Sequence, residues 1–363
     1  MNHPDSDRCR ESLDTARTSA YATSRRDFLL AGTSVLVSCA GDAPRLNIYN
    51  WSDYVAPDTI PGFEQEFGIR VRYGTFESNQ EMLAKVMGGN SGWDIVFPSA
   101  EYIQPMRDMG LLARLNHTWL PDLDALEPTF QHPPWDTQLD WCVPYMHGVT
   151  GIAYRTDLRP APLSWASLWE DRLRGKVTML DDPPEVFGAC LKMLGYSLNS
   201  GNPEELRKAQ RKAIEQKGVL RAYLNAEVRD QLASGDVAAA QAWAVTAAQA
   251  MAGAPGKVAF SFPAEGFARF ADNVAILRES RRSKPAHAFI NYLLRPRVAA
   301  DIVNAVKTAT ANARAHALLG PELREHPALY PPEEILMRGE WFAPQPAEVQ
   351  RLRDRLWTEI KRA

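Results

Sequence analysis

Three strand-like runs alternate with two helical patterns between residues 45 and 100, and this order constrains the fold more than any other feature. "RLNIYN", "IRVRYGTF" and "WDIVFPSA" are short runs of apolar or alternating character, which is typical of β-strands. Between them, "TIPGFEQEFG" places Ile60, Phe63 and Phe67 on one helical face. "SNQEMLAKVMGG" opens with a serine and a glutamate in capping-box spacing. The sequence therefore predicts a βαβαβ unit of an α/β fold.

Polar and aromatic side chains follow the carboxyl ends of these predicted strands, which fall at Asn50, Thr75 and Pro98. The first end runs into "NWSDY" and the third into "PSAEY". In open α/β sheets, ligands bind outside the carboxyl ends of the strands. We therefore expect a binding site at this edge.

The rest of the chain repeats the alternation and predicts a second lobe. "CVPYMHGVTGIAYR", residues 142–155, is rich in β-forming residues and can cross between two lobes. After it come the strand-like runs "GKVTMLDD" and "GDVAAAQAWAV" and the helix-like runs "PEVFGACLKMLGYS" and "PEELRKAQRKAIEQKG". "DNVAIL", residues 272–277, predicts a strand that returns to the first lobe. Residues 284–306 predict one helix broken at Pro296 or two helices.

Size and composition agree with a globular chain of two cores. The length of 363 residues exceeds the ~250–300 residues at which single cores usually divide. Hydrophobic residues make up 45% of the chain and charged residues 23%. The formal net charge is only −3, and no run is rich in Lys and Arg. The sequence therefore predicts no nucleic-acid partner.

The first forty residues carry an export pattern. "SRRDFLLAGTSVLVSCAG" sets Arg25 and Arg26 before an apolar stretch over residues 28–37. This stretch is too short for a bilayer, which needs ~20 apolar residues, so it predicts a signal peptide over residues 1–38 of the twin-arginine type. "LVSC" resembles a lipoprotein cleavage box that leaves Cys39 as a lipidated first residue, with simple cleavage nearby as the alternative. We expect the mature protein in the periplasm, anchored through Cys39.

Two cysteines, Cys142 and Cys190, remain in the chain beyond Cys39. Outside the cytoplasm they can form a disulfide. A disulfide needs Cα atoms within ~7 Å, which sequence does not show. Two buried free thiols are the alternative.

Motifs of enzymes and cofactor sites are absent from the sequence. The seven histidines are scattered, and there is no HExxH, GxSxG, phosphate loop, CxxC or glycine-rich dinucleotide fingerprint. We therefore predict no catalytic residues, no metal site and no cofactor. Catalytic groups assembled only in space escape such a search, so an enzyme remains an alternative.

Carboxylates stand beside aromatic residues at several predicted element ends: Asp53, Glu101, Asp182, Glu185 and Asp272. Each also has an ordinary structural interpretation. Asp182 and Glu185 fit the N-cap and third position of a helix that starts with proline. Asp53 can cap the next helix, and the other two acids can be solvated in loops.

Two tryptophans near these acids, Trp51 and Trp243, are by default core residues. Taken singly, each structural interpretation is adequate. The joint placement of acids and aromatic rings at strand ends favours a binding site instead.

Seven blocks in order from Leu46 to Trp341 resemble the spermidine/putrescine-binding proteins of polyamine ABC transporters, within the extracellular solute-binding proteins. The blocks are "YNWSDYVAP", "YGTFESNQEMLAKV", "WDIVFPSAEYI", "MLDDPPEVFGACLKMLGYS", "DNVAIL", "FINYLLRPRVA" and "ATANARAHALLGPELREHPALYPPEEILMRGEW". The resemblance implies a two-lobe, type II periplasmic-binding-protein-like α/β fold, with hinge strands near Val149 and Asp272. The expected lobes are 45–148 plus 273–312 and 149–272 plus 313–363.

The resemblance also implies a set of ligand contacts. They fall on Trp51, Ser52, Asp53, Tyr54, Ser99, Asp182, Glu185, Trp243 and Asp272. Carboxylates accept charge-assisted hydrogen bonds from the ammonium groups of a polyamine. Aromatic faces bind cations and cover the methylene spacers between them.

Four departures from the family pattern bear on the ligand. Glu101 stands where relatives often have an aromatic residue, Phe270 where some have tryptophan, and Phe342 where a glutamine can reach the ligand. After Trp243, "AVTAAQ" lacks a carboxylate of diamine-preferring members. If Glu101 points inward, it favours spermidine or spermine over putrescine; if it points to solvent, it has no effect.

The function that the resemblance implies is capture of a polyamine between the lobes and delivery to a membrane permease of an ABC transporter, by a monomer. One alternative is a polyamine sensor that partners a membrane receptor. Another is a protein of the same fold that binds a different solute. Anion binders would place Arg or Lys at these strand ends, and ferric-ion relatives would show two adjacent tyrosines.

Overall fold

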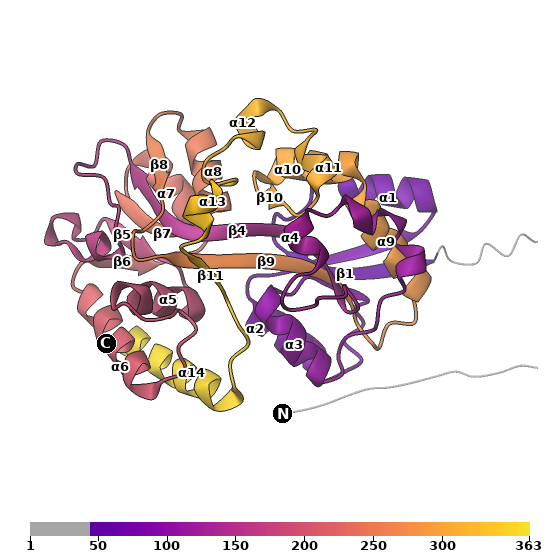
Figure 1. Ribbon diagram of the computed structural model, residues 1–363, viewed down its shortest axis with the longest axis horizontal. Coiled ribbons are helices and arrows are strands. Elements are labelled where there is room, and N and C mark those ends of the chain that lie inside the picture. Colours follow the sequence, from indigo (N-terminus) through magenta and orange to yellow (C-terminus); the bar gives the residue numbers. More distant parts are fainter. Residues whose placement is uncertain (1–43) are drawn as a thin grey trace, which may run out of the picture. The chain divides into compact units, whose positions relative to one another are not determined.

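The structure, a computed structural model, describes residues 44–363 (Figure 1). Within these residues the strands form an 11-stranded sheet whose main path is β2-β1-β3-β9-β4-β7-β5-β6. Strands β8 and β10 pair with β4 outside this path, and β11 pairs with β9. The predicted signal peptide over residues 1–38 and the predicted lipidation at Cys39 lie outside the described residues.

The first lobe begins with the predicted βαβαβ unit. Its elements are β1 (Arg45–Trp51), α1 (Thr59–Phe67), β2 (Arg70–Phe76), α2 (Asn79–Met87), β3 (Ile95–Val96) and α3 (Ala100–Asp108), followed by the short helices η1 (His117–Trp119), η2 (Pro121–Ala125) and α4 (Pro128–Gln131). Strand β1 pairs in parallel with β2 and with β3. Strand β3 is shorter than the predicted run, because only Ile95 and Val96 are paired.

Local sequence sets the helix ends of this unit. Helix α1 stops at Gly68, whose φ of 64° is the left-handed conformation that glycine adopts readily. The Ser78 hydroxyl accepts the backbone N–H of Glu81 at 3.1 Å, as the predicted capping box requires. The Glu81 carboxylate, however, accepts the backbone N–H of Glu77 rather than that of Ser78. The side chains of Ser78 and Glu81 therefore each hold a backbone N–H at the junction of β2 and α2.

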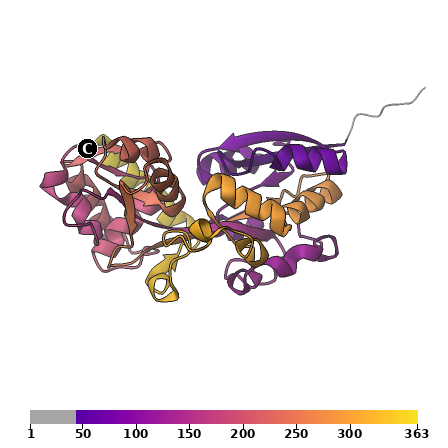
Figure 2. The same cartoon turned by 90° about the horizontal axis from the view of Figure 1, so that it is seen from above.

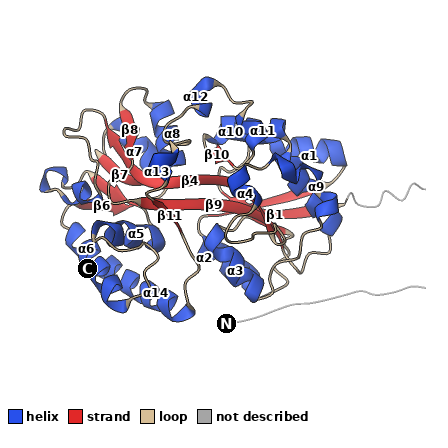
Figure 3. Cartoon of the chain, viewed as in Figure 1, coloured by secondary structure: helices blue, strands red, loops and turns tan. Residues whose placement is uncertain are grey.

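Two long antiparallel strands, β4 (Cys142–Arg155) and β9 (Phe267–Ile276), join the lobes (Figures 1 and 3). A bulge beside Pro144 accommodates this proline within β4. Strand β9 also pairs with β3 of the first lobe, whereas β4 continues into a pairing with β7 of the second. The predicted crossing strand and the predicted return strand are both confirmed.

The second lobe repeats the alternation of strands and helices. Its elements are η3 (Trp165–Trp169), η4 (Asp171–Leu173), β5 (Val177–Met179), α5 (Pro183–Met193), α6 (Pro203–Gln216), β6 (Leu220–Tyr223), α7 (Val228–Ser234), β7 (Ala239–Trp243), α8 (Ala244–Gly253) and β8 (Val258–Ser261). Strand β5 lies between β6 and β7 and is parallel to both. This part of the sheet is therefore α/β in type, like the first lobe.

Residues 283–363 return to the first lobe and then to the second. They form α9 (Ser283–Leu294), α10 (Pro296–Val306), β10 (Ala309–Thr310), α11 (Ala313–His316), α12 (Pro321–Arg324), α13 (Glu333–Leu336), β11 (Gly339–Trp341) and α14 (Ala347–Arg362). Helices α9 and α10 meet at Pro296, so the two-helix alternative is correct. Figure 2 shows the orange helices on one lobe, and the yellow C-terminal helix α14 packs on α6 of the other.

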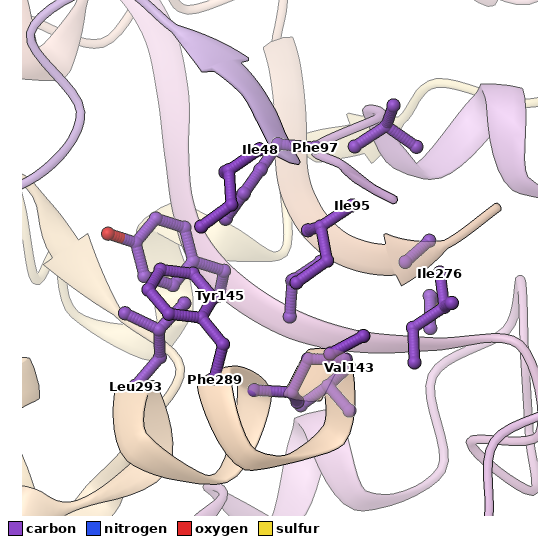
Figure 4. Packing of buried hydrophobic residues seen from close by; sticks show 14 of the residues in the cluster. Ile48, Ile95, Phe97, Val143, Tyr145, Ile276, Phe289 and Leu293 are labelled. Atoms are coloured by element: carbon purple, nitrogen blue, oxygen red, sulfur yellow. The ribbon is translucent and has the colours of Figure 1, made fainter. Parts of the chain in front are cut away.

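Two large hydrophobic clusters form the cores of the lobes. In the first, Ile48, Phe97 and Tyr145 pack with Phe289 and Leu293 of α9 (Figure 4). The second cluster is built on Trp165 and the buried faces of α5 and α6, with a smaller cluster between α7 and α8. Within residues 44–363, none of the helices is long and apolar enough to span a bilayer.

The two cysteines belong to different cores. Cys142 is buried in the first cluster and Cys190 in the second, and both are free thiols. The disulfide alternative is therefore wrong, and the alternative of two buried thiols is correct. Burial raises the pKa of each thiol above its usual value, so both are held in the neutral form.

Candidate ligand-binding site

A cavity of about 380 Å³ lies where the ends of several strands and helices converge. All twelve residues that the sequence singled out line it: Trp51, Ser52, Asp53, Tyr54, Ser99, Glu101, Asp182, Glu185, Trp243, Phe270, Asp272 and Phe342. They come from the loop after β1, the start of α3, the start of α5, the end of β7, strand β9 and the segment after β11. Elements of both lobes therefore meet at one site.

Asp272 is a strand residue and not the solvated loop acid of the structural alternative. It lies in β9 and is only 5% exposed. The Tyr54 hydroxyl donates to its Oδ2 at 2.6 Å, and the Ser99 hydroxyl donates to its Oδ1 at 2.6 Å. Asn79 in turn holds Ser99, because its side chain binds both the Ser99 hydroxyl and the Ser99 backbone N–H. Burial raises the pKa of Asp272 to about 6, an effect that the two hydroxyls oppose.

Asp182 and Glu185 both begin α5 and line the cavity. Asp182 Oδ1 accepts the backbone N–H of Glu185 at 3.1 Å, so the predicted N-cap is confirmed. Glu185 Oε1 accepts the Thr150 hydroxyl at 2.7 Å and the Trp243 indole N–H at 3.0 Å. Burial raises the pKa of both acids, and the charge of Asp182 raises that of Glu185 further. The capping role and a ligand role are therefore compatible.

The end of β1 and the loop after it present an indole and three polar side chains to the cavity. The Trp51 indole N–H donates to the Phe97 carbonyl at 2.9 Å, which fixes the ring plane. The Ser52 hydroxyl donates to Glu77 at 2.5 Å. Asp53 is exposed, with a φ of 53°, and Asp58 occupies the N-cap position of α1. The alternative in which Asp53 caps this helix is therefore wrong.

Glu101 points inward. It lies in the first turn of α3 rather than in a loop, and its Oε2 is buried. Burial raises its pKa to about 8, and the charges of Asp272 and Asp182 add to the shift. The alternative in which Glu101 is a solvated loop acid is wrong.

Aromatic rings form the apolar walls of the cavity: Trp51, Tyr54, Tyr102, Trp243, Phe270 and Phe342. Phe270 lies directly over Gly148 of strand β4. A Cβ atom at Gly148 would stand 2.6 Å from Cζ of this ring, so a larger residue there would displace it. Glycine is therefore needed to place the Phe270 wall.

Sequence reasoning missed several lining residues, chiefly Glu77, Asn79, Gln80, Tyr102, Asn225, Glu227, Arg229, Thr246 and Gln249. Glu77 directly follows β2 and Asn79 begins α2 two residues later, so the rule that ligands bind at strand ends would have found them. Arg229 lies on α7, and no local signal places it at the cavity. Its guanidinium bonds to Asp230 at 3.0 Å, and the charge of Asp53 adds to the raised pKa of Arg229.

Acidic residues far outnumber basic ones in the lining. The acids Asp53, Glu77, Glu101, Asp182, Glu185, Glu227 and Asp272 face a single basic lining residue, Arg229. Residues 44–363 contain no cluster of three or more His, Cys, Asp or Glu placed to hold a metal ion. Separated carboxylates between aromatic walls suit an organic cation with spaced charges.

The buried acids make stability depend on pH. Glu101 keeps its proton in the folded state up to a pKa of about 8, against an ordinary value of 4.5, so between these values the folded state binds more protons than the unfolded state. The free energy of unfolding of the ligand-free protein should therefore fall as pH rises from 5 to 8. We expect the melting temperature to drop by roughly 5 °C over this range in wild type. The drop should be smaller in Glu101→Gln, and equal drops in wild type and this variant would contradict the assignment.

Comparison with known proteins places the chain among transport proteins. Residues 60–331 match the model of a family described as bacterial extracellular solute-binding protein. The chain is 34% identical to the putrescine-binding periplasmic protein PotF of Escherichia coli strain K12, over 92% of this chain and 96% of that protein. It is 33% identical to a spermidine/putrescine-binding periplasmic protein of Salmonella typhimurium, over 87% and 92%.

A solved structure shows the same fold. The spermidine/putrescine ABC transporter substrate-binding protein PotD of Streptococcus pneumoniae superposes with a TM-score of 0.77 at 30% identity, over 88% of this chain and 99% of that one. The predicted two-lobe periplasmic-binding-protein fold is therefore confirmed.

Proposed function

Because the chain belongs to the bacterial extracellular solute-binding proteins, we propose that it captures a polyamine in the anionic cavity and delivers it to the permease of an ABC transporter. The observation that carries this proposal is a pair of buried acids whose carboxylates are oriented by hydrogen bonds and line the cavity. Asp272 and Glu185 each accept two fixed donors and still line the cavity. Two relatives at 33–34% identity are named as putrescine-binding and spermidine/putrescine-binding proteins, and these ligands agree with this chemistry.

In the proposed complex, the acids pair with ammonium groups and the aromatic walls cover the methylene spacers. Asp272 and Glu185 hold two ammonium groups, and Ser52, Ser99 and Asp53 add polar contacts. Two unit charges ~4 Å apart attract by about 1 kcal/mol in water and about 4 kcal/mol at an effective dielectric of 20. Contacts therefore strengthen when the cavity excludes water, provided that every buried charge is paired.

Closure of the lobes on the ligand follows from the same charges. Without a cation, the carboxylates of the cavity repel one another or hold protons, and with a polyamine they attract it from both lobes. We propose that β4 and β9 act as the hinge between lobes 45–148 plus 273–312 and 149–272 plus 313–363. The hinge strands pair along their length, so bending is expected near the bulge beside Pro144.

The remaining proposals concern the place and state of the protein. We propose export by the twin-arginine route, removal of residues 1–38 and a lipid anchor at Cys39, with the mature protein a periplasmic monomer. A lipid anchor keeps the protein close to its permease. The proposed protein binds its ligand and releases it unchanged, without catalysis.

Uptake in cells tests delivery. In a strain that lacks this chain, the rate of entry of labelled spermidine from a dilute solution is expected to fall at least about tenfold and to recover with the wild-type gene. Unchanged uptake, together with altered signalling from a membrane receptor, would instead support the sensor alternative. A thermal-shift panel of polyamines, a neutral sugar and sulfate addresses binding separately, and only the polyamines should stabilise the protein.

A further inference from the structure

Glu101 differs from the other buried acids because one of its oxygens has no partner. Its Oε2 is buried and accepts no hydrogen bond from any residue in the described part of the chain. Asp272 accepts two hydroxyl groups, and Glu185 accepts a hydroxyl and an indole N–H. Buried polar atoms are nearly always hydrogen-bonded. The missing donor at Glu101 is therefore expected from a molecule that enters the cavity.

The position of Glu101 is distinct from those of Asp272 and Glu185, the two acids that hold ammonium groups in the proposed complex. It starts α3, whereas Asp272 lies in β9 and Glu185 in α5. Charge on Asp272 and on Asp182 raises the pKa of Glu101, and charge on Glu101 raises that of Glu185. Glu101 therefore adds a further acidic position to the wall of the cavity that Asp272 and Glu185 also line.

A diamine cannot satisfy three such positions. Its two ammonium groups pair with two of the acids, and the third is left as an unpaired buried carboxylate or as a protonated acid. An unpaired buried charge is strongly unfavourable, so the third acid must then stay protonated and attracts nothing. A linear amine with three or more ammonium groups pairs with all three acids and supplies the donor that Glu101 Oε2 lacks.

We infer that Glu101 is a third ammonium subsite, which makes the cavity selective for triamines and tetraamines over diamines. The inference rests on the proposed polyamine-binding function and narrows it to ligands of higher charge. Trp51, Trp243 and Phe342 all line the cavity, so it offers apolar cover for more than one methylene spacer.

Calorimetric titrations of wild type and Glu101→Gln with putrescine, spermidine, spermine and the two monoacetylated spermidines test the inference. The acetylated compounds keep the backbone of spermidine with one charge fewer, so they separate charge from length. Wild type is expected to bind spermidine and spermine at least about tenfold more tightly than putrescine and the acetylated amines. Glu101→Gln should lose most of this preference, while its affinity for putrescine changes by less than about threefold.

Glu348→Gln is the matched control. Glu348 is exposed on α14 and lies outside the cavity lining, so the preference should survive this change. Melting curves verify that each variant is folded. If Glu101→Gln loses affinity equally for all amines, Glu101 lies in a subsite that diamines also occupy. If no affinity changes, Glu101 does not contact the ligand. Either result overturns the inference. If no amine binds wild type, the proposed function fails instead.

Discussion

Asp272→Asn is expected to weaken polyamine binding by about 100-fold or more. The substitution keeps the shape of the side chain and can still bond to Tyr54 and Ser99, but it removes the charge that pairs with a buried ammonium group. Breaking one partner of a buried ion pair costs roughly 3–5 kcal/mol, and every 1.4 kcal/mol is tenfold in affinity. Calorimetric titration with spermidine measures the loss.

The same change should leave the fold intact or make it more stable. Asp272 has a pKa raised to about 6 by burial, so its charged form is unfavourable in the ligand-free protein at neutral pH. Asn carries no such penalty, and the melting temperature at pH 8 is expected to be equal to or above that of wild type. Asp108→Asn, the same chemical change at an exposed residue of α3, should alter neither property. Retained affinity in Asp272→Asn would show that the ammonium group binds elsewhere.

Trp243→Ala is expected to weaken binding by about 100-fold as well, for two reasons. The indole face is lost as an apolar wall and as a cation–π partner, and Glu185 loses the N–H that orients its carboxylate. A desolvated cation–π contact contributes about 2 kcal/mol, and a hydrogen bond to a charged group contributes ~1.5–3 kcal/mol. Titration with spermidine and a melting curve separate lost affinity from lost stability.

Trp243→Phe tells the two reasons apart. Phenylalanine keeps an aromatic face and removes the N–H, so its affinity should fall between those of wild type and Trp243→Ala. Trp119→Ala serves as the control, because Trp119 is 37% exposed and lies outside the cavity lining. Wild-type affinity in Trp243→Ala would rule out this ring as a wall of the ligand site.

Much of the architecture was predictable because local patterns decide it. The runs before Trp51 and around Val96 are strands, and the glycine after α1 ends that helix as its position predicts. The same patterns located the site, since the rule that ligands bind at strand ends selects the loop after β1 and the start of α3. The placement of Asp182 at a helix start was equally local, because the two prolines after it fit only the first turn.

Other features depend on contacts that no local pattern records. An apolar run does not tell how many of its residues pair, and β3 keeps only Ile95 and Val96 in the sheet. Glu101 lines the cavity from the first turn of α3, where the structural alternative had placed it in a loop. Arg229 reaches the cavity through the packing of α7 on α8 in the second lobe. The thiol state of Cys142 is likewise fixed by which core the residue joins.

Titration of the protein from Arg45 onward with spermidine, by calorimetry at pH 8 and at pH 5, decides whether the cavity binds a polyamine. We expect saturable binding at one site, weaker at pH 5 because Glu101 and Asp272 are then protonated, and no heat from a neutral sugar. The proton release that accompanies binding near neutral pH should make the heat depend on the buffer. Absence of spermidine binding at both pH values, or equal binding by Asp272→Asn, would contradict the account.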